Sequence, residues 1–147
     1  KAKMREVDAV YGGEMSAHHY FRDFMYCDSG MIPWLLVAEH VSRTGRSLGD
    51  LVAGARAAYP SSGEINFRLA DADAARAAFE AAYAGAAREV DRLDGLSLTF
   101  EGWRANLRAS NTEPVLRLNV EAAGDARLVA AKVAEISALL ESAGGRG

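Results

Sequence analysis

The sequence has few of the features that mark secreted, membrane-bound or nucleic-acid-binding proteins. Its 147 residues include one cysteine, Cys27, which has no partner for an internal disulfide and so fits a reducing cytoplasm. No apolar run approaches the roughly 18 residues of a membrane-spanning helix, and no apolar signal region follows the charged first residues. The formal net charge of −3 argues against nucleic acid as the main partner. These absences predict a cytoplasmic protein that binds neither membranes nor nucleic acids.

The composition is that of a globular chain with a core. Half of the residues, 50%, are hydrophobic and 25% are charged, which is far from the composition of disordered proteins. A chain of this length is sufficient for an ordinary domain with a hydrophobic core.

The first third of the chain carries helix and strand signals with clear punctuation. In chain order, the expected elements are a helix to residue 6, strands at 9–11 and 18–21, and helices over 31–43 and 48–58. Asp28 with Ser29, and later Ser47, are residue types that cap helices. We therefore predict part of an α/β domain over residues 1–50 and a second domain over residues 51–147.

The second domain alternates strands and helices in a different order. Its expected strands are at 64–69, 96–100, 103–108 and 114–121, and its expected helices run over 71–90 and from residue 125 onwards. Asp71 and Asp125 are placed to cap the two helices. The sequence predicts an α+β fold in which a four-stranded antiparallel sheet carries helices on one face.

The loop between the last two expected strands concentrates groups that bind anions. Arg108 offers a planar fork of donors that matches phosphate oxygens. Ser110, Asn111 and Thr112 follow it with short hydrogen-bonding side chains. The same residue types also form ordinary turns, because their side chains bond to their own backbone. From the residues alone, both a plain hairpin turn and a phosphate site remain open.

A second polar segment lies between the first two expected strands. If residues 13–17 are extended, alternate side chains point the same way, so Glu14, Ser16 and His18 share one face. A carboxylate, a hydroxyl and an imidazole suit the hydroxyls of a sugar, but a polar hairpin edge would look the same. His18 and His19 point to opposite faces of a strand and do not chelate one ion, so we predict no metal site. No nucleophile motif accompanies either segment, and we assign no catalytic residue.

Both segments resemble motifs of one family. Arg-Ala-Ser-Asn-Thr-Glu-Pro at 108–114 is similar to the phosphate-binding loop of the α-D-phosphohexomutases. Gly-Glu-Met-Ser-Ala-His at 13–18 resembles the sugar-binding loop of the bacterial phosphomannomutase/phosphoglucomutase branch. The two motifs stand in the family's order, and the resemblance covers essentially the whole chain.

The resemblance implies a role in binding hexose phosphates. Arg108, Ser110, Asn111 and Thr112 would hold the phosphate, while Glu14, Ser16 and His18 would hold the O3 and O4 hydroxyls of the sugar. The reaction of the family interconverts hexose 1-phosphate and hexose 6-phosphate through a phosphoserine and a hexose 1,6-bisphosphate. The C-terminal domain of the family has a sheet like that of the TATA-binding protein, a likeness that implies nothing about DNA.

The resemblance also implies that the chain is a C-terminal fragment of a phosphohexomutase, made of the end of domain 3 and all of domain 4. The catalytic serine loop and the aspartate loop that holds Mg²⁺ belong to earlier domains, and neither loop occurs in this sequence. We therefore expect the missing domains to be partners, the Mg²⁺ site to lie outside this chain, and the chain alone to be inactive. The alternative is a stand-alone phosphate- or sugar-binding module without catalysis.

Overall fold

The computed structural model describes residues 1–14, 16–110 and 112–145. The chain divides into two compact units, residues 1–51 and residues 52–147.

The first unit contains a small antiparallel sheet with strand order β1-β2-β3. Its elements are α1 (Ala2–Glu6), β1 (Tyr11–Gly13), β2 (His19–Phe21), η1 (Arg22–Phe24), β3 (Cys27–Asp28) and α2 (Met31–Thr44), followed by α3 (Leu48–Ala58), which continues into the second unit. The first strand was expected at 9–11, but it lies at Tyr11–Gly13, where Gly12 and Gly13 pair with Tyr20 and His19. Glycine suits this strand because a Cβ on Gly12 would lie 2.7 Å from the sulfur of Met4.

The ends of α2 and α3 follow from local residues. Ser29 Oγ accepts a hydrogen bond from the backbone N–H of Ile32 at the start of α2. Gly45 ends that helix in the left-handed conformation, with φ of 66°, where glycine has no steric penalty. Ser47 Oγ accepts from the N–H of Asp50 and so caps α3. Asp28, which was also expected to cap α2, contacts His18 instead.

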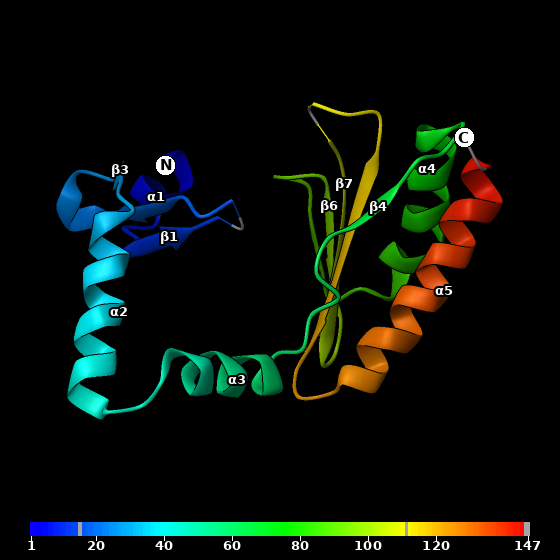
Figure 1. Ribbon diagram of the computed structural model, residues 1–147. Coiled ribbons are helices and arrows are strands. Elements are labelled where there is room, and N and C mark those ends of the chain that lie inside the picture. The colour runs from blue at the N-terminus through cyan, green and yellow to red at the C-terminus, as the bar shows by residue number, and fades with distance from the viewer. Residues whose placement is uncertain (15, 111, 146–147) are drawn as a thin grey trace. The chain divides into compact units, whose positions relative to one another are not determined.

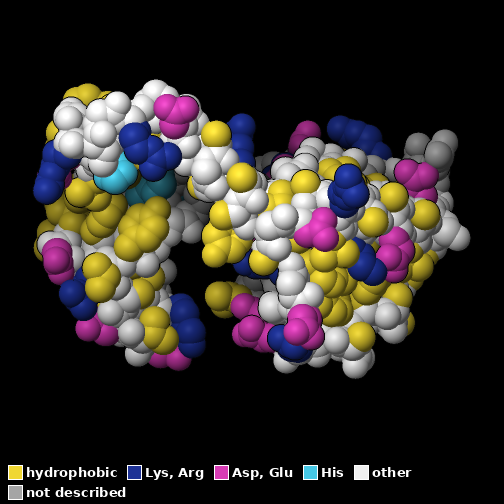
Figure 2. All heavy atoms as spheres, turned by 90° about the horizontal axis from the view of Figure 1, so that it is seen from below, with side chains coloured by type: hydrophobic (Ala, Val, Ile, Leu, Met, Phe, Trp, Pro, Cys, Tyr) yellow, Lys and Arg dark blue, Asp and Glu magenta, His cyan; other side chains and the backbone are white. Residues whose placement is uncertain are grey.

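The first unit exposes much of its apolar surface. None of its described residues is buried, and large side chains of α2 such as Trp34, Leu35 and Leu36 are more than half exposed. Figure 2 shows broad hydrophobic patches on the part of the surface that carries the histidines. In the part of the chain that the structure describes, no helix is both long enough and apolar enough to cross a membrane.

The second unit is an antiparallel sheet covered on one face by two helices (Figure 1). The strand order is β4-β8-β7-β6-β5. The elements are β4 (Ile65–Phe67), α4 (Ala72–Tyr83), η2 (Ala84–Ala86), β5 (Glu89–Asp91), β6 (Leu96–Thr99), β7 (Trp103–Ala109), β8 (Leu116–Ala122) and α5 (Ala126–Gly144). This architecture confirms the predicted α+β class, with an antiparallel sheet and helices on one face.

The sheet has five strands, one more than expected. The additional strand is β5, whose Val90 pairs with Leu98 of β6. The preceding helix was expected to run through residue 90, but α4 ends at Tyr83 and a short 3-10 turn follows it. Alanine-rich sequence continues past the end of α4, and the helix was expected to run through the stop signal at Gly85, so the edge strand was assigned to the predicted helix.

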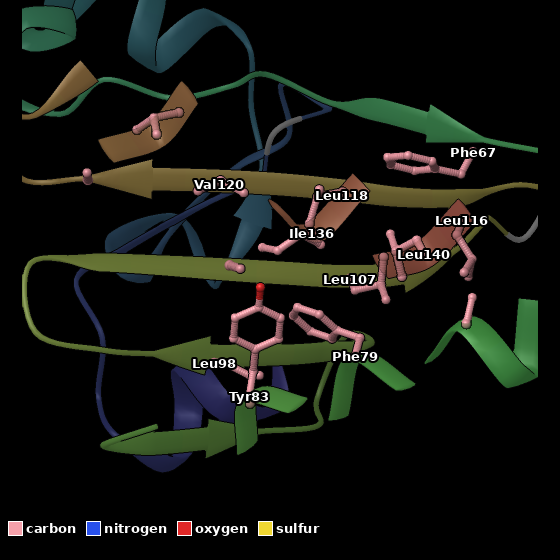
Figure 3. Close-up of a cluster of buried hydrophobic side chains, with 14 residues drawn as sticks. Phe67, Phe79, Tyr83, Leu98, Leu107, Leu116, Leu118, Val120, Ile136 and Leu140 are labelled. Carbon is pink, nitrogen blue, oxygen red and sulfur yellow. The ribbon is translucent and has the colours of Figure 1, made fainter. Parts of the chain in front are cut away.

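The core lies between the sheet and the two helices. Leu107 of β7 and Leu118 of β8 are buried opposite each other, and Phe79 of α4 and Ile136 of α5 are fully buried above them. Figure 3 shows these side chains converging from the strands and both helices. Alternate residues of β7 and β8 therefore point away from the helices, where they line a polar face of the sheet.

Burial should govern the stability of the second unit. Leu140 is 0% exposed, whereas Leu93 in a turn is 79% exposed. We expect Leu140→Ala to lower the free energy of unfolding by about 2–5 kcal/mol, because it removes core contacts and leaves a cavity. The matched change Leu93→Ala should alter it by less than about 0.5 kcal/mol. Urea denaturation of both variants checks this, and equal losses would contradict the assigned core.

Candidate functional site

The predicted phosphate loop joins β7 to β8 and is organised by Ser110. Its backbone N–H donates to the carbonyl of Val115 at 2.9 Å, which closes the loop. Its hydroxyl oxygen accepts from the backbone N–H groups of Thr112 and Glu113, at 3.3 and 3.2 Å, and lies 3.4 Å from Thr112 Oγ1. Ser110 and Thr112 thus lie close together, and the Ser110 side chain forms the hydrogen bonds of an ordinary turn. Asn111, the remaining predicted loop residue, lies outside the described residues.

Arg108 stands at the end of β7, on the polar face of the sheet. Its Nη2 donates to Oε2 of Glu64 at 3.0 Å. The pairing of β7 with β8 places Arg117 directly opposite Arg108. The three side chains are only 21–26% exposed, so their charges are partly shielded from water. The guanidinium of Arg108 is therefore already held in place by the carboxylate of Glu64, the residue just before β4.

Arg117 completes this group through two contacts. Its Nε lies 3.3 Å from Oε1 of Glu64, close enough for an ion pair but without hydrogen-bond geometry, so that buried nitrogen has no hydrogen-bond partner among the described residues. Its Nη2 donates to Oε2 of Glu113 in the loop at 3.4 Å. Glu64 thus lies between two arginines, and Arg117 connects Glu64 to the loop.

Sequence reasoning missed Glu64 and Arg117 as members of this site. A signal for Arg117 was present, because a hairpin closed by residues 110–115 pairs strands symmetrically about the loop and brings 117 opposite 108. Glu64 is 44 residues from Arg108, and no local pattern connects them.

Gly95 supports Arg108 from the backbone side. A Cβ at this position would lie 2.5 Å from Cβ of Arg108 and 2.6 Å from the carbonyl oxygen of Leu107, distances that real Cβ atoms do not adopt. Its φ of +72° also favours glycine. The turn is tied to the same strand by Asn106, whose Nδ2 donates to the carbonyl of Asp94 at 2.8 Å. A polar cavity of about 390 Å³ lies beside this turn and includes Arg108 in its lining.

The predicted sugar loop is a closed turn and not an extended segment. The N–H of Glu14 donates to the carbonyl of His18 at 2.9 Å, and the N–H of Ala17 donates to the carbonyl of Glu14 at 3.0 Å. Ala17 has a φ of +64°, a left-handed conformation that costs a non-glycine residue about 1 kcal/mol. The condition under which alternation would align Glu14, Ser16 and His18, an extended backbone, is therefore not met, because these two hydrogen bonds form a turn.

Side-chain contacts nevertheless link the residues of the turn. Ser16 Oγ donates to Oε2 of Glu14 at 3.3 Å, and the hydroxyl of Tyr20 donates to Oε1 at 2.8 Å. The ring of Tyr20 in turn stacks on that of His18, with 6.4 Å between the centroids. Tyr20 thus connects the carboxylate to the imidazole. The hydrogen bond to Glu14 raises the pKa of Tyr20.

Asp28 orients His18 and does not cap α2 as expected. Its Oδ2 lies 2.7 Å from Nδ1 of His18, and its Oδ1 accepts from the backbone N–H of His19 at 2.9 Å. The sheet explains the difference, because Asp28 pairs with Tyr20 across β3 and β2, next to His19. The hydrogen bond to Asp28, together with its negative charge, raises the pKa of His18. The same bond lowers the pKa of Asp28.

The adjacent histidines His18 and His19 have separate partners. Nδ1 of His19 lies 2.7 Å from the hydroxyl of Tyr11, away from the contact between His18 and Asp28. Across residues 1–14, 16–110 and 112–145, no group of three His, Cys, Asp or Glu side chains could hold a metal ion.

The pairing of His18 with Asp28 predicts a pH dependence. His18 should titrate above the ordinary value of 6.5, and Asp28 should titrate below 3.8. The ion pair then stabilises the turn at pH values between the pKa of Asp28 and the pKa of His18. This stabilisation is lost as the pH rises through the raised pKa of His18 or falls through the lowered pKa of Asp28. NMR titration of the His18 ring should show its pKa fall in Asp28→Asn and stay unchanged in the control Asp23→Asn. An unchanged pKa in Asp28→Asn would contradict the assignment.

Comparison with known proteins gives the same family over both units. Residues 1–59 match the model of the phosphoglucomutase/phosphomannomutase α/β/α domain III, and residues 64–139 match that of the phosphoglucomutase/phosphomannomutase C-terminal domain.

Similar proteins share most of this sequence. A phosphomannomutase from Salmonella montevideo is 64% identical over 142 residues, which are 97% of this chain and 31% of that protein. A protein of Xanthomonas campestris pv. campestris (strain B100) described as phosphohexose mutases is 61% identical over 140 residues, or 95% of this chain and 31% of its own length.

The crystal structure of a phosphoglucomutase/phosphomannomutase family protein from Burkholderia thailandensis matches 99% of this chain and 31% of its own, with a TM-score of 0.70 and 26% identity. The chain thus spans about a third of the length of the relatives that it matches. With both of its units matched in order, this chain belongs to the phosphoglucomutase/phosphomannomutase family.

Proposed function

We propose that this chain is the substrate-binding portion of a phosphohexomutase that interconverts hexose 1-phosphate and hexose 6-phosphate, with mannose or glucose as the sugar. The observation that carries the proposal is the placement of Arg108 at the mouth of a closed loop whose residues can donate to an anion. Family membership supports it, because similar proteins are described as phosphomannomutase and phosphohexose mutases.

The phosphate would bind at the loop between β7 and β8. A guanidinium has five N–H donors, and in the described residues one nitrogen of Arg108 is bonded to Glu64. The other donors of Arg108 are available for a bidentate contact with phosphate oxygens. The hydroxyls of Ser110 and Thr112 lie together at 3.4 Å and would add short donors. We extend the proposal to Asn111 because of its place in the motif.

The sugar hydroxyls would bind at the turn of the first unit. Glu14 presents a carboxylate whose two oxygens already accept hydroxyl hydrogens, from Ser16 and Tyr20. Sugar hydroxyls could take these places with the same chemistry. His18 is held at Nδ1 by Asp28, which leaves Nε2 to contact a hydroxyl.

Binding by this chain would serve chemistry that occurs elsewhere in a longer protein. In the proposed reaction, a phosphoserine outside this sequence donates its phosphoryl group, a hexose 1,6-bisphosphate forms, and the other phosphate returns to the serine. The contacts to the distal phosphate and hydroxyls would position the reacting end, since remote binding energy lowers the barrier by orientation. The sequence contains neither the serine loop nor the aspartate loop that the family resemblance implies, so we assign this chain binding and orientation only.

Removal of Arg108 tests the phosphate site. Arg108→Ala should weaken binding of glucose 1-phosphate by about 2 kcal/mol, or roughly 30-fold in Kd, because a charged hydrogen-bonding contact is lost. The control is Arg127→Ala, at an exposed position near the start of α5. Isothermal titration calorimetry on the parent chain and both variants measures the effect. Arg108→Ala binding as tightly as the parent would rule out the phosphate site.

Removal of the Glu14 charge tests the sugar site separately. Glu14→Gln should weaken glucose 1-phosphate several-fold, because the amide accepts hydroxyl hydrogens less strongly than a carboxylate. Inorganic phosphate should bind the variant as it binds the parent, since it has no sugar hydroxyls. Competition of the two ligands, followed by NMR, provides both affinities. Equal losses for both ligands would show that this turn does not contact the sugar.

A further inference from the structure

We propose that Glu64 is a positioning residue of the phosphate site, acting through Arg108. The inference rests on the proposed function, because it assumes that Arg108 binds the phosphate. Glu64 carries a negative charge beside a site for an anion. Its charge alone would weaken phosphate binding, whereas its positioning of Arg108 strengthens it. The sign of its effect therefore distinguishes positioning from simple electrostatics.

The first observation is the like-charged pair on neighbouring strands. Arg108 and Arg117 are directly opposite in the register of β7 and β8. Side chains in such positions have Cβ atoms about 4.5–5.5 Å apart, and like charges there repel. Glu64 lies immediately before β4, which pairs with β8. One of its carboxylate oxygens is 3.0 Å from Arg108, and the other is 3.3 Å from Arg117. This bridge allows both cations to stay on one side of the sheet.

The second observation is that Glu64 limits where the guanidinium of Arg108 can go. An arginine side chain has many rotamers, and ordering it on binding costs conformational entropy. The backbone and Cβ of Arg108 are packed against Gly95, and its far end is bonded to Glu64. With both ends held, the remaining donors of Arg108 are presented to a ligand with little further loss of freedom.

The third observation concerns what holds Glu64. Its exposed fraction is 25%, and its second oxygen faces Arg117, which also bonds Glu113 of the loop at 3.4 Å. The carboxylate is therefore fixed by a neighbour that also contacts the phosphate loop. These contacts hold Arg108, Glu64 and the phosphate loop in one arrangement.

The chain offers a matched control for the charge. Glu121 lies on β8 with the same face orientation and forms an ion pair with Arg104 at 4.0 Å. It stands four residues from Arg117, or about 13 Å along a strand, which is longer than the Debye length at 0.1 M salt. Glu121→Gln removes the same charge from the same face of the sheet without touching Arg108.

The experiment measures the Kd of glucose 1-phosphate by calorimetry at 0.1 M salt. Glu64→Gln should weaken binding about five- to tenfold, in proportion to the lost pre-organisation of one arginine. Glu121→Gln should leave it within about twofold, as expected for a screened surface charge. Glu64→Asp, which keeps the charge but is shorter, should recover part of the loss.

A double-mutant cycle separates positioning from a general loss of structure. In an Arg108→Ala background, Glu64→Gln should have no further effect on Kd, because its action passes through Arg108. A full additional loss in that background would overturn the proposal, as would unchanged or tighter binding by Glu64→Gln alone. If Glu64→Gln does not fold, Glu64→Asp decides, since affinity equal to that of the parent would also overturn it.

Failure of the positioning role differs from failure of the proposed function. If Arg108→Ala weakens binding and Glu64→Gln does not, the phosphate site stands and Glu64 has no part in it. If the parent chain does not bind glucose 1-phosphate, or Arg108→Ala binds as well as the parent, both proposals fall together.

Discussion

Seven residue pairs join β7 to β8, from Trp103 opposite Ala122 to Ala109 opposite Leu116. This register decides both faces of the sheet at once, because side chains alternate along a strand. On one face it stacks Leu107 against Leu118 beneath the helices. On the other face it brings Arg108 opposite Arg117. A slip by one residue would move the apolar side chains out of the core and the arginines into it, so the core also fixes the site.

The two polar segments share one arrangement of side chains. In each, a carboxylate holds one nitrogen of a basic side chain. Glu64 contacts Nη2 of Arg108 at 3.0 Å, and Asp28 contacts Nδ1 of His18 at 2.7 Å. Each contact restricts the rotamers of the side chain that it holds and leaves other nitrogens of that side chain for a ligand. In the proposed function, the first pair would present donors to phosphate and the second would present a ring nitrogen to a sugar hydroxyl.

Local features of the structure could be predicted from the sequence, and distant contacts could not. Asp71 and Asp125 cap their helices as expected, because a cap depends on residues three positions apart. The strands around the phosphate loop followed from alternation and a clear turn. Asp28 was assigned to the nearest helix because its partner His18 is ten residues back, just before the strand that pairs with β3. Glu64 and β5 were missed because each is defined by what it pairs with and not by its own neighbours.

The most direct test of a phosphate and sugar site in this chain is an NMR chemical-shift titration of the isotopically labelled protein with glucose 1-phosphate. The account predicts saturable shifts at Arg108, Ser110 and Thr112, with a second group of shifts at Glu14, Ser16 and His18. Inorganic phosphate should reproduce the first group and not the second. No saturable shift at either segment with millimolar glucose 1-phosphate would contradict the account and leave the β7–β8 loop as an ordinary hairpin turn.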